Sequence, residues 1–176
     1  SVKQPCSLNR LSNLIKATGT PCSPSTVMEY VRYLQESCLL ISIDNYASKF
    51  VEKETIKKHY FVDNGLLHLF INNPNTSLLE NLCTITLYKK YSKGLYYYNR
   101  NIEVDFYVPD EGLAVQASYQ MSDEETIERE VKALVTLHGL YPLKRAMIIT
   151  YEDEGEIVRD GLKIEIRPAW KWVLEG

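Results

Sequence analysis

The side chains best suited to chemistry lie in residues 101–120, NIEVDFYVPDEGLAVQASYQ, whose alternation predicts two strands joined by a turn. Asp105 lies inside the first strand, where an apolar residue would be less costly. Gln116 and Ser118 are two positions apart on the second strand, so their side chains share one face of the sheet. Metal-dependent nucleases use a strand acid beside an acid-x-lysine pair to hold a divalent ion and orient water. The stretch therefore predicts a nuclease-like site without its lysine, or a solvated strand face.

The residue types at this site argue against cleavage. Gln116 is neutral and cannot supply carboxylate charge to a hard cation, and Ser118 cannot replace an ammonium. Glu80, in a helical segment upstream, has the residue type of a further ligand. We therefore expect a degenerate catalytic site at Glu80, Asp105, Gln116 and Ser118. Within it, Glu80 and Asp105 are the predicted metal ligands, and they would hold one Mg²⁺ or Mn²⁺ ion weakly.

The two acids also have purely structural interpretations. Ser77 and Glu80 have the S-x-x-E spacing of a capping box, in which Glu80 would only secure a helix start. Asp105 shares a strand face with Glu103 and Tyr107, opposite the apolar residues of that strand, as in a half-exposed antiparallel strand. The sequence leaves both interpretations open beside the nuclease-like one.

The first part of the chain predicts two short helices and a hairpin. Residues 7–18 and 23–38 have the apolar spacing of amphipathic helices, and residues 39–46 and 57–63 alternate as strands do. Two helices followed by a hairpin is the order of a winged helix-turn-helix. The first helix of that fold is expected upstream, in a longer protein of which this chain is a part.

The second part predicts the order α-β-β-β-α-β-β, with Ser122 and Glu125 as a capping box at the start of its second helix. Residues 63–77 contain the helix-breaking run NNPN and are expected to connect two domains, 1–71 and 72–176. The fold class is thus predicted as α+β or α/β. The predicted elements of the second domain are helices at 77–91 and 122–138, strands at 95–99, 102–108, 113–119 and 144–151, and a closing strand with an apolar tail at 161–174.

Basic residues offer contacts for nucleic acid. The net charge of −3 gives no overall attraction to phosphate, so such contacts depend on local patches. Exposed basic clusters are also often only solvated, and protein contact is the alternative. The candidate phosphate-binding residues are Arg32 on the second helix, Lys53, Lys57, Lys58 and His59 on the hairpin, and Lys89, Lys90, Lys93 and Arg100 in the second domain.

Several classes of site are not indicated. No G-x-x-x-x-G-K-[ST] run is present, so ATP binding by a P-loop is not expected in these residues. The four cysteines have no zinc-site or disulfide-scaffold spacing, which favours a reducing cytoplasm. No apolar run approaches the roughly 20 residues of a membrane span. We therefore expect a cytoplasmic protein without a membrane partner.

Blocks along the chain resemble one protein family. They are STVMEYVRYLQESCLL, KKHYFVDNGLLHLF, LLENLCTITLYKK, YYYNRNIEVDFYV, LAVQASYQMSDEETIEREVKAL and KRAMIITYEDE, in this order. They look like the C-terminal region of uncharacterised prokaryotic AAA-type ATPases. That resemblance implies a winged helix followed by a domain of unknown function with a PD-(D/E)XK restriction-endonuclease-like fold. It also implies an ATPase domain upstream that binds ATP, and it matches Glu80, Asp105 and Gln116 to the nuclease-like site.

The leading functional hypothesis is an accessory region of such an ATPase, not itself catalytic, that contacts DNA or a protein. The first alternative is a working metal-dependent nuclease, in which Glu80, Asp105 and Glu103 bind magnesium and a lysine recruited from elsewhere replaces Ser118. The second is a DNA-binding regulator that uses the winged helix alone. The excess of tyrosine and the tail with Trp170 and Trp172 suggest exposed apolar surface, and with it a homodimer.

Overall fold

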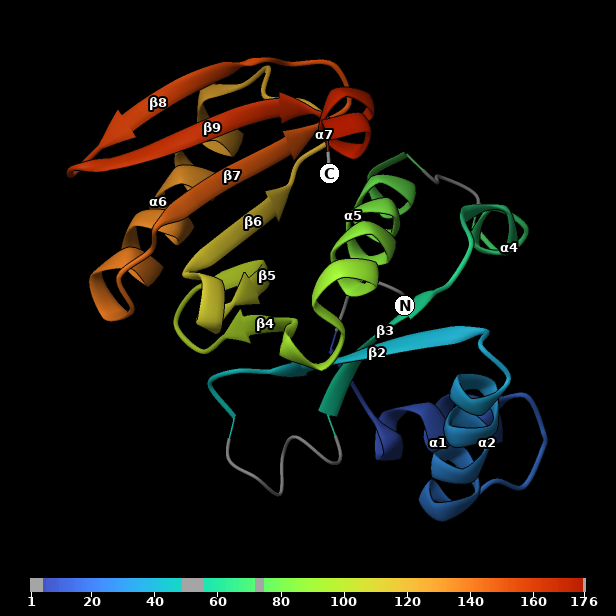
Figure 1. Ribbon diagram of the computed structural model, residues 1–176. Helices are drawn as coiled ribbons and strands as arrows, with labels where there is room; N and C mark the ends of the chain where they lie inside the picture. Colours follow the sequence, from blue (N-terminus) through green and yellow to red (C-terminus); the bar gives the residue numbers. More distant parts are fainter. Residues whose placement is uncertain (1–4, 49–55, 72–74, 176) are drawn as a thin grey trace.

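Strands from both halves of the chain form one mixed sheet in the computed structural model, which describes residues 5–48, 56–71 and 75–175 (Figure 1). The order across this nine-stranded sheet is β1-β3-β2-β4-β5-β6-β7-β9-β8. The pairs β2–β4, β6–β7 and β7–β9 are parallel, and the other pairs are antiparallel. In the described ranges the strands are β1 Cys6–Ser7, β2 Leu40–Asn45, β3 Ile56–Phe61, β4 Tyr96–Asn99, β5 Glu103–Val108, β6 Leu113–Ala117, β7 Arg145–Thr150, β8 Gly155–Arg159 and β9 Leu162–Pro168.

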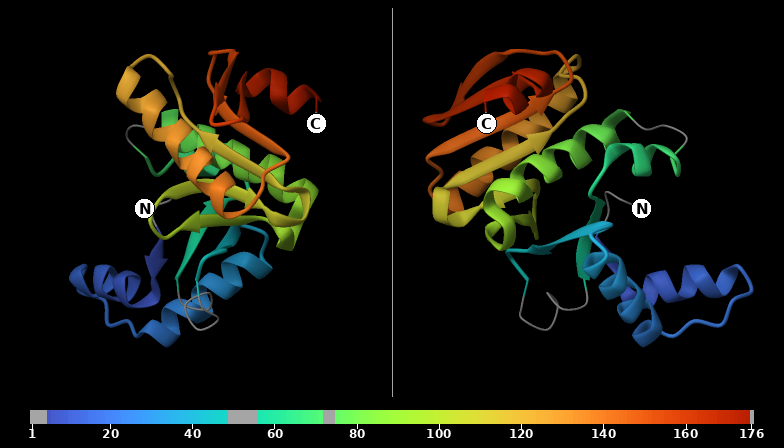
Figure 2. Two further views of the ribbon diagram at one scale, coloured as in Figure 1. Left: turned by 90° about the vertical axis from the view of Figure 1, so that its left-hand side faces the viewer. Right: turned by 45° about the vertical axis from the view of Figure 1, so that its right-hand side comes forward.

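Helices cover both faces of the sheet. α5 and α7 lie on one face and α6 on the other, whereas α1 and α2 lie beside the β2–β3 hairpin (Figures 1 and 2). Ser7 and Ser23 cap α1 and α2, because each side chain accepts a hydrogen bond from a backbone N–H three residues on. The helices among the described residues are α1 Leu8–Ala17, α2 Pro24–Glu36, α4 Asn64–His68, α5 Asn75–Tyr91, α6 Glu124–Leu140 and α7 Ala169–Glu175.

Strand β6 shows how the two faces are filled. Leu113 and Val115 belong to the apolar cluster beneath α5, which also contains Leu79, Cys83 and Leu87 of that helix. Ala114 belongs to the opposite cluster, with Val131, Leu134 and Leu137 of α6. A strand that is buried on both faces is apolar at nearly every position, which explains the continuous run LAV at the start of β6.

The sheet crosses the predicted domain boundary at residues 71 and 72. Strand β2 pairs in parallel with β4, with Asp44 opposite Tyr96. The Asn45 side chain extends this pairing, because its Nδ2 donates to the Asn99 carbonyl at 2.7 Å and its Oδ1 accepts from the Asn99 N–H at 3.0 Å. The two predicted units therefore share one hydrogen-bonded sheet.

The mixed α and β class is confirmed, and several local predictions need correction. α5 begins at Asn75, so Ser77 lies inside the helix and the predicted capping box with Glu80 is wrong. α6 is capped by Asp123, whose side chain accepts from the Thr126 N–H, rather than by Ser122. The predicted connection contains α4, and the apolar tail is the helix α7. β8 and the short β1 were not predicted.

Parts of the sequence interpretation lie outside the described residues. These parts are Lys53 and the helix-breaking run at 72–74. None of the helices in the described ranges combines the length and the apolar character that a membrane span requires.

Candidate functional site

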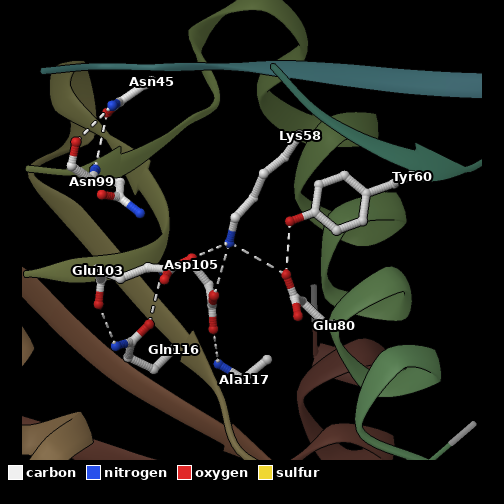
Figure 3. A network of polar contacts seen from close by, with 9 residues as sticks. All are labelled: Asn45, Lys58, Tyr60, Glu80, Asn99, Glu103, Asp105, Gln116 and Ala117. Atoms are coloured by element: carbon white, nitrogen blue, oxygen red, sulfur yellow. Dashed lines mark hydrogen bonds and ion pairs between the residues drawn. The ribbon is translucent and has the colours of Figure 1, made fainter. Parts of the chain in front are cut away.

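Lys58 projects from β3 into the interior of the molecule. Side chains alternate along β3, so Lys58 lies on the same face as Tyr60, which packs in the cluster beneath α5. Only 1% of Lys58 is exposed. Its aliphatic stem carries the ammonium past the edge of the hairpin to a point between α5 and β5 (Figure 3).

Three carboxylates surround the Lys58 ammonium. The Nζ atom lies 2.9 Å from Glu103 Oε1, 3.2 Å from Asp105 Oδ1 and 3.5 Å from Glu80 Oε1. Glu80 comes from α5, while Glu103 and Asp105 come from β5, so the cluster joins three elements. The Glu80 side chain is 5% exposed and that of Asp105 17%, whereas that of Glu103 is 42% exposed and opens to solvent. We call these four residues the Lys58 cluster.

The electrostatics of the cluster keep Lys58 charged. Burial by itself lowers the pKa of a lysine, but the charges of Asp105, Glu80 and Glu103 outweigh that effect and leave the pKa of Lys58 raised. Tyr60 adds a hydrogen bond, because its hydroxyl donates to Glu80 Oε1 at 2.8 Å. Burial, followed by the charge of Glu80, raises the pKa of Tyr60 well above its usual value. Tyr60 is therefore a neutral hydrogen-bond donor to Glu80.

A β-bulge places Asp105 and Phe106 on the same face of β5. Tyr96 pairs with Tyr107 and Tyr98 pairs with Val104, so Asp105 and Phe106 together face one residue of β4. The extra residue breaks the alternation of β5. Consequently, Val104 packs in the core beneath α6 and Phe106 in the core beneath α5.

The predicted solvated strand face is therefore wrong. Asp105 is mostly enclosed, and Tyr107, which was placed on the same polar face, is 3% exposed and packs beneath α6. The interpretation relied on strict period-two alternation, which the bulge removes.

Gln116 holds β5 in place rather than facing the ammonium. Its Oε1 accepts from the Asp105 N–H at 2.8 Å, and its Nε2 donates to the Glu103 carbonyl at 3.1 Å. The neighbouring Ala117 N–H donates to Asp105 Oδ2 at 3.1 Å. An amide side chain with one acceptor and one donor can replace a pair of strand hydrogen bonds, which a carboxylate cannot do. The neutral residue at position 116 thus has a structural explanation.

The four predicted catalytic positions are only partly brought together. Glu80 and Asp105 meet at the Lys58 ammonium, and Gln116 contacts the backbone on either side of Val104. Ser118 is buried, and its hydroxyl donates to the Gln120 carbonyl at 3.1 Å within its own turn. Ser118 therefore takes no part in the Lys58 cluster.

Lys58 was predicted as a surface contact for phosphate, and its position corrects that prediction. Lys57 and Lys58 are consecutive on a strand, so one of them must face inward, and this signal could have identified Lys58. Lys57 faces outward and pairs with Asp44 at 3.1 Å. Arg32 pairs with Glu36 on the surface of α2. Lys89 and Lys90 lie exposed in the last turn of α5.

The carboxylate oxygens of the Lys58 cluster are of the type that binds magnesium, but the Lys58 ammonium occupies the point between them. Carboxylate oxygens are the ligands that Mg²⁺ prefers, and both predicted metal ligands, Glu80 and Asp105, are present. The described part of the chain contains no group of three or more acidic, histidine or cysteine side chains arranged to hold a metal ion. A divalent ion at this point would have to displace the Lys58 ammonium.

Comparison with known proteins identifies one relative of undetermined function. The chain is 31% identical over 183 residues to the uncharacterised protein MJ1544 of Methanocaldococcus jannaschii. The alignment covers 96% of this chain and 40% of that protein, so the chain spans less than half the length of this relative. No protein-family model matches the sequence, and no solved structure matches it significantly.

Proposed function

We propose that this chain is a catalytically degenerate, nuclease-like module in the C-terminal region of an AAA-type ATPase, and that it contacts a protein or nucleic acid without cutting it. The helices α1 and α2 with the β2–β3 hairpin support a winged-helix part. The helix α5, the antiparallel strands β4 to β6 and the crossover through α6 to the parallel strand β7 support a restriction-endonuclease-like part.

The position of Lys58 carries the proposal that the module does not cleave. A reacting phosphate and its attacking water must come within about 3 Å of the groups that activate them. The Lys58 ammonium is enclosed and already contacts Glu80, Glu103 and Asp105. In this proposal Lys58 is an internal cation that offsets part of the negative charge of the carboxylates, in the position where an active nuclease would hold a metal ion.

Metal binding by a Lys58→Met variant tests this role. The variant retains the carboxylates but lacks the ammonium, so it should be less stable and should gain stability from Mn²⁺. At Mn²⁺ ten times above the dissociation constant, binding would add about 1.4 kcal/mol to the free energy of unfolding. The wild type, with its own internal cation, should gain nothing. Lys57→Met, which removes the neighbouring charge from the outer face, is the matched control and should also gain nothing.

A metal-dependent phosphodiesterase is the second candidate. It is favoured because Lys58 supplies a lysine from another strand, as the nuclease alternative requires, and because Glu103 leaves one side of the cluster exposed. In that case the wild type should nick plasmid DNA with Mg²⁺ or Mn²⁺, and both Asp105→Asn and Lys58→Met should abolish nicking. Wild-type nicking that Asp105→Asn abolishes would overturn the non-catalytic proposal.

The proposed partner in the same polypeptide is an ATPase domain that binds ATP. The greater length of the archaeal relative supports the presence of further segments in the full protein. Co-purification of this module with the separately expressed remainder of the full protein would test that association.

Gel-shift assays with double-stranded and single-stranded DNA at two salt concentrations would test whether the module binds nucleic acid, since phosphate contacts weaken steeply with salt.

A further inference from the structure

A wedge-shaped cavity of about 620 Å³ lies between α5 and α7, over the first residues of β6 and β7. The two helices contact each other directly and lie on the same face of the sheet (Figure 1). The cavity has the volume of small-molecule sites, which is about 300–1,000 Å³. It shares no residue with the Lys58 cluster, and it does not depend on the function proposed above.

The floor and walls of this cavity are apolar. Leu113 and Met147 form the floor at the starts of the parallel strands β6 and β7. Leu82 and Ile85 of α5 form one wall, and Trp172 of α7 stands opposite. Leu82, Ile85 and Trp172 are only partly buried, so apolar surface remains accessible in the cavity.

Positive charge gathers at one end of the cavity. Lys89 and Lys90 belong to the last turn of α5, and Arg145 begins β7 at the same edge of the sheet. Arg145 is engaged by Glu165 through two hydrogen bonds of 3.1 Å. Glu175, which also lines this end, pairs with Arg167. Within the described residues neither Lys89 nor Lys90 forms an ion pair, and the Lys90 ammonium lies 5.7 Å from the centre of the Tyr91 ring, so neither positive charge is neutralised by a carboxylate.

We propose that this cavity binds an amphiphilic anion, a small molecule with an apolar or aromatic body that ends in a carboxylate, sulfonate or phosphate. The body would lie against Met147, Ile85 and Trp172, and the anionic group would lie at Lys89 and Lys90. The positive charges of Lys89 and Lys90 at one end of the cavity favour an anion over a neutral or cationic ligand. The apolar floor selects an amphiphile over a free inorganic anion.

The test compares two dyes of similar apolar shape and different charge. The dye 8-anilinonaphthalene-1-sulfonate carries a sulfonate, and N-phenyl-1-naphthylamine is neutral. In a Trp170→Phe background Trp172 is the sole tryptophan, and quenching of its emission reports binding. The double variant Lys89→Gln/Lys90→Gln should weaken binding of the sulfonate about five- to tenfold and leave binding of the neutral dye unchanged.

Two further variants separate this site from general dye binding. Val173→Asp, which places a carboxylate on the partly exposed rim formed by α7, should weaken binding of both dyes. Lys16→Gln/Lys132→Gln removes the same charge from α1 and α6 and should change neither affinity. The proposal is overturned if Lys89→Gln/Lys90→Gln leaves the sulfonate affinity unchanged, or if the control pair lowers it equally. It is also overturned if neither dye quenches Trp172.

Discussion

Lys58 and Asp105 are 47 positions apart in the sequence, yet the ammonium of one lies 3.2 Å from the carboxylate of the other. The contact joins the β2–β3 hairpin to β5, across the boundary predicted at residues 71 and 72. It puts a lysine beside Asp105, although Ser118 occupies the position where the proposed nuclease-like motif would have its lysine. Under the function proposed above, Lys58 is a structural cation, and under the alternative it is a catalytic lysine.

Removal of Lys58 should destabilise the protein strongly. Lys58→Met leaves Glu80 and Asp105 enclosed without their counter-charge, which should cost about 3–5 kcal/mol in the free energy of unfolding. Combining it with Asp105→Asn should cost clearly less than the sum of the two single changes, because one uncompensated charge is removed. Urea unfolding of the four proteins in this cycle gives the coupling. Glu103→Gln, at the exposed side of the cluster, should cost at most about 1 kcal/mol. A fully additive cycle for Lys58 and Asp105 would contradict the role of the ammonium.

The stability of the protein should fall both when the Gln116 amide is removed and when it is replaced by a carboxylate. Gln116→Leu leaves the Asp105 N–H and the Glu103 carbonyl without their side-chain partner, which should cost about 1–3 kcal/mol for buried groups. Gln116→Glu introduces a carboxylate, which cannot donate to the Glu103 carbonyl and adds negative charge. We expect it to destabilise the protein at neutral pH as well, as measured by thermal unfolding. Gln35→Ala on the exposed face of α2 is the control. A Gln116→Glu variant as stable as the wild type would show that the amide is not required.

His59 should make stability depend on acidic pH. Burial, followed by the charge of Lys57, lowers the pKa of His59 from 6.5 to about 4, and Ser42 Oγ lies 2.7 Å from its Nδ1. The unfolded chain therefore binds the proton more readily than the folded one between these pH values. Stability from His59 is complete above about pH 6.5 and declines as the pH falls toward 4. Urea unfolding from pH 7 to pH 4 should show a shallower decline for His59→Gln. If the free energy of unfolding falls equally with pH in the wild type and in His59→Gln, His59 makes no such contribution.

Asn45 should couple the two halves of the sheet. Its side chain makes hydrogen bonds to both backbone groups of Asn99 and also accepts from the Ala47 N–H at 3.1 Å. Asn45→Ala leaves these groups unpaired where β2 meets β4 and should cost about 1–3 kcal/mol. We expect the urea transition of the variant to broaden, because the hairpin half loses part of its attachment. Fluorescence and circular dichroism measured on the same samples should then give separate midpoints. Coincident, equally steep transitions would show that the rest of the sheet suffices to couple the halves.

The local elements could be predicted because each depends on neighbours in the sequence. Leu8, Leu11 and Ile15 share a helical face, and residues 102–108 alternate, so their helix and strand follow from periodicity. The short strand β8 was missed because Gly155–Arg159 has almost no buried face, and its pairing with β9 supplies most of its order. The cap of α6 was misassigned because Ser122 and Asp123 are both good caps, and only the backbone path selects between them.

For the candidate site, the sequence alone determined that Glu80, Asp105 and Gln116 were residues of interest and that position 118 lacked a cation. Only the tertiary structure decided that the Lys58 ammonium lies between Glu80 and Asp105. The consecutive Lys57 and Lys58 indicate that one lysine of the strand faces inward, but nothing near them in the sequence reveals that the hairpin joins a larger sheet. The parallel pairing of β2 with β4, which joins Asp44 to the distant Tyr96, brings the hairpin beside β5, and the bulge in the neighbouring β4–β5 pair places Phe106 on the same face as Asp105; neither feature follows from the residue pattern of a single strand.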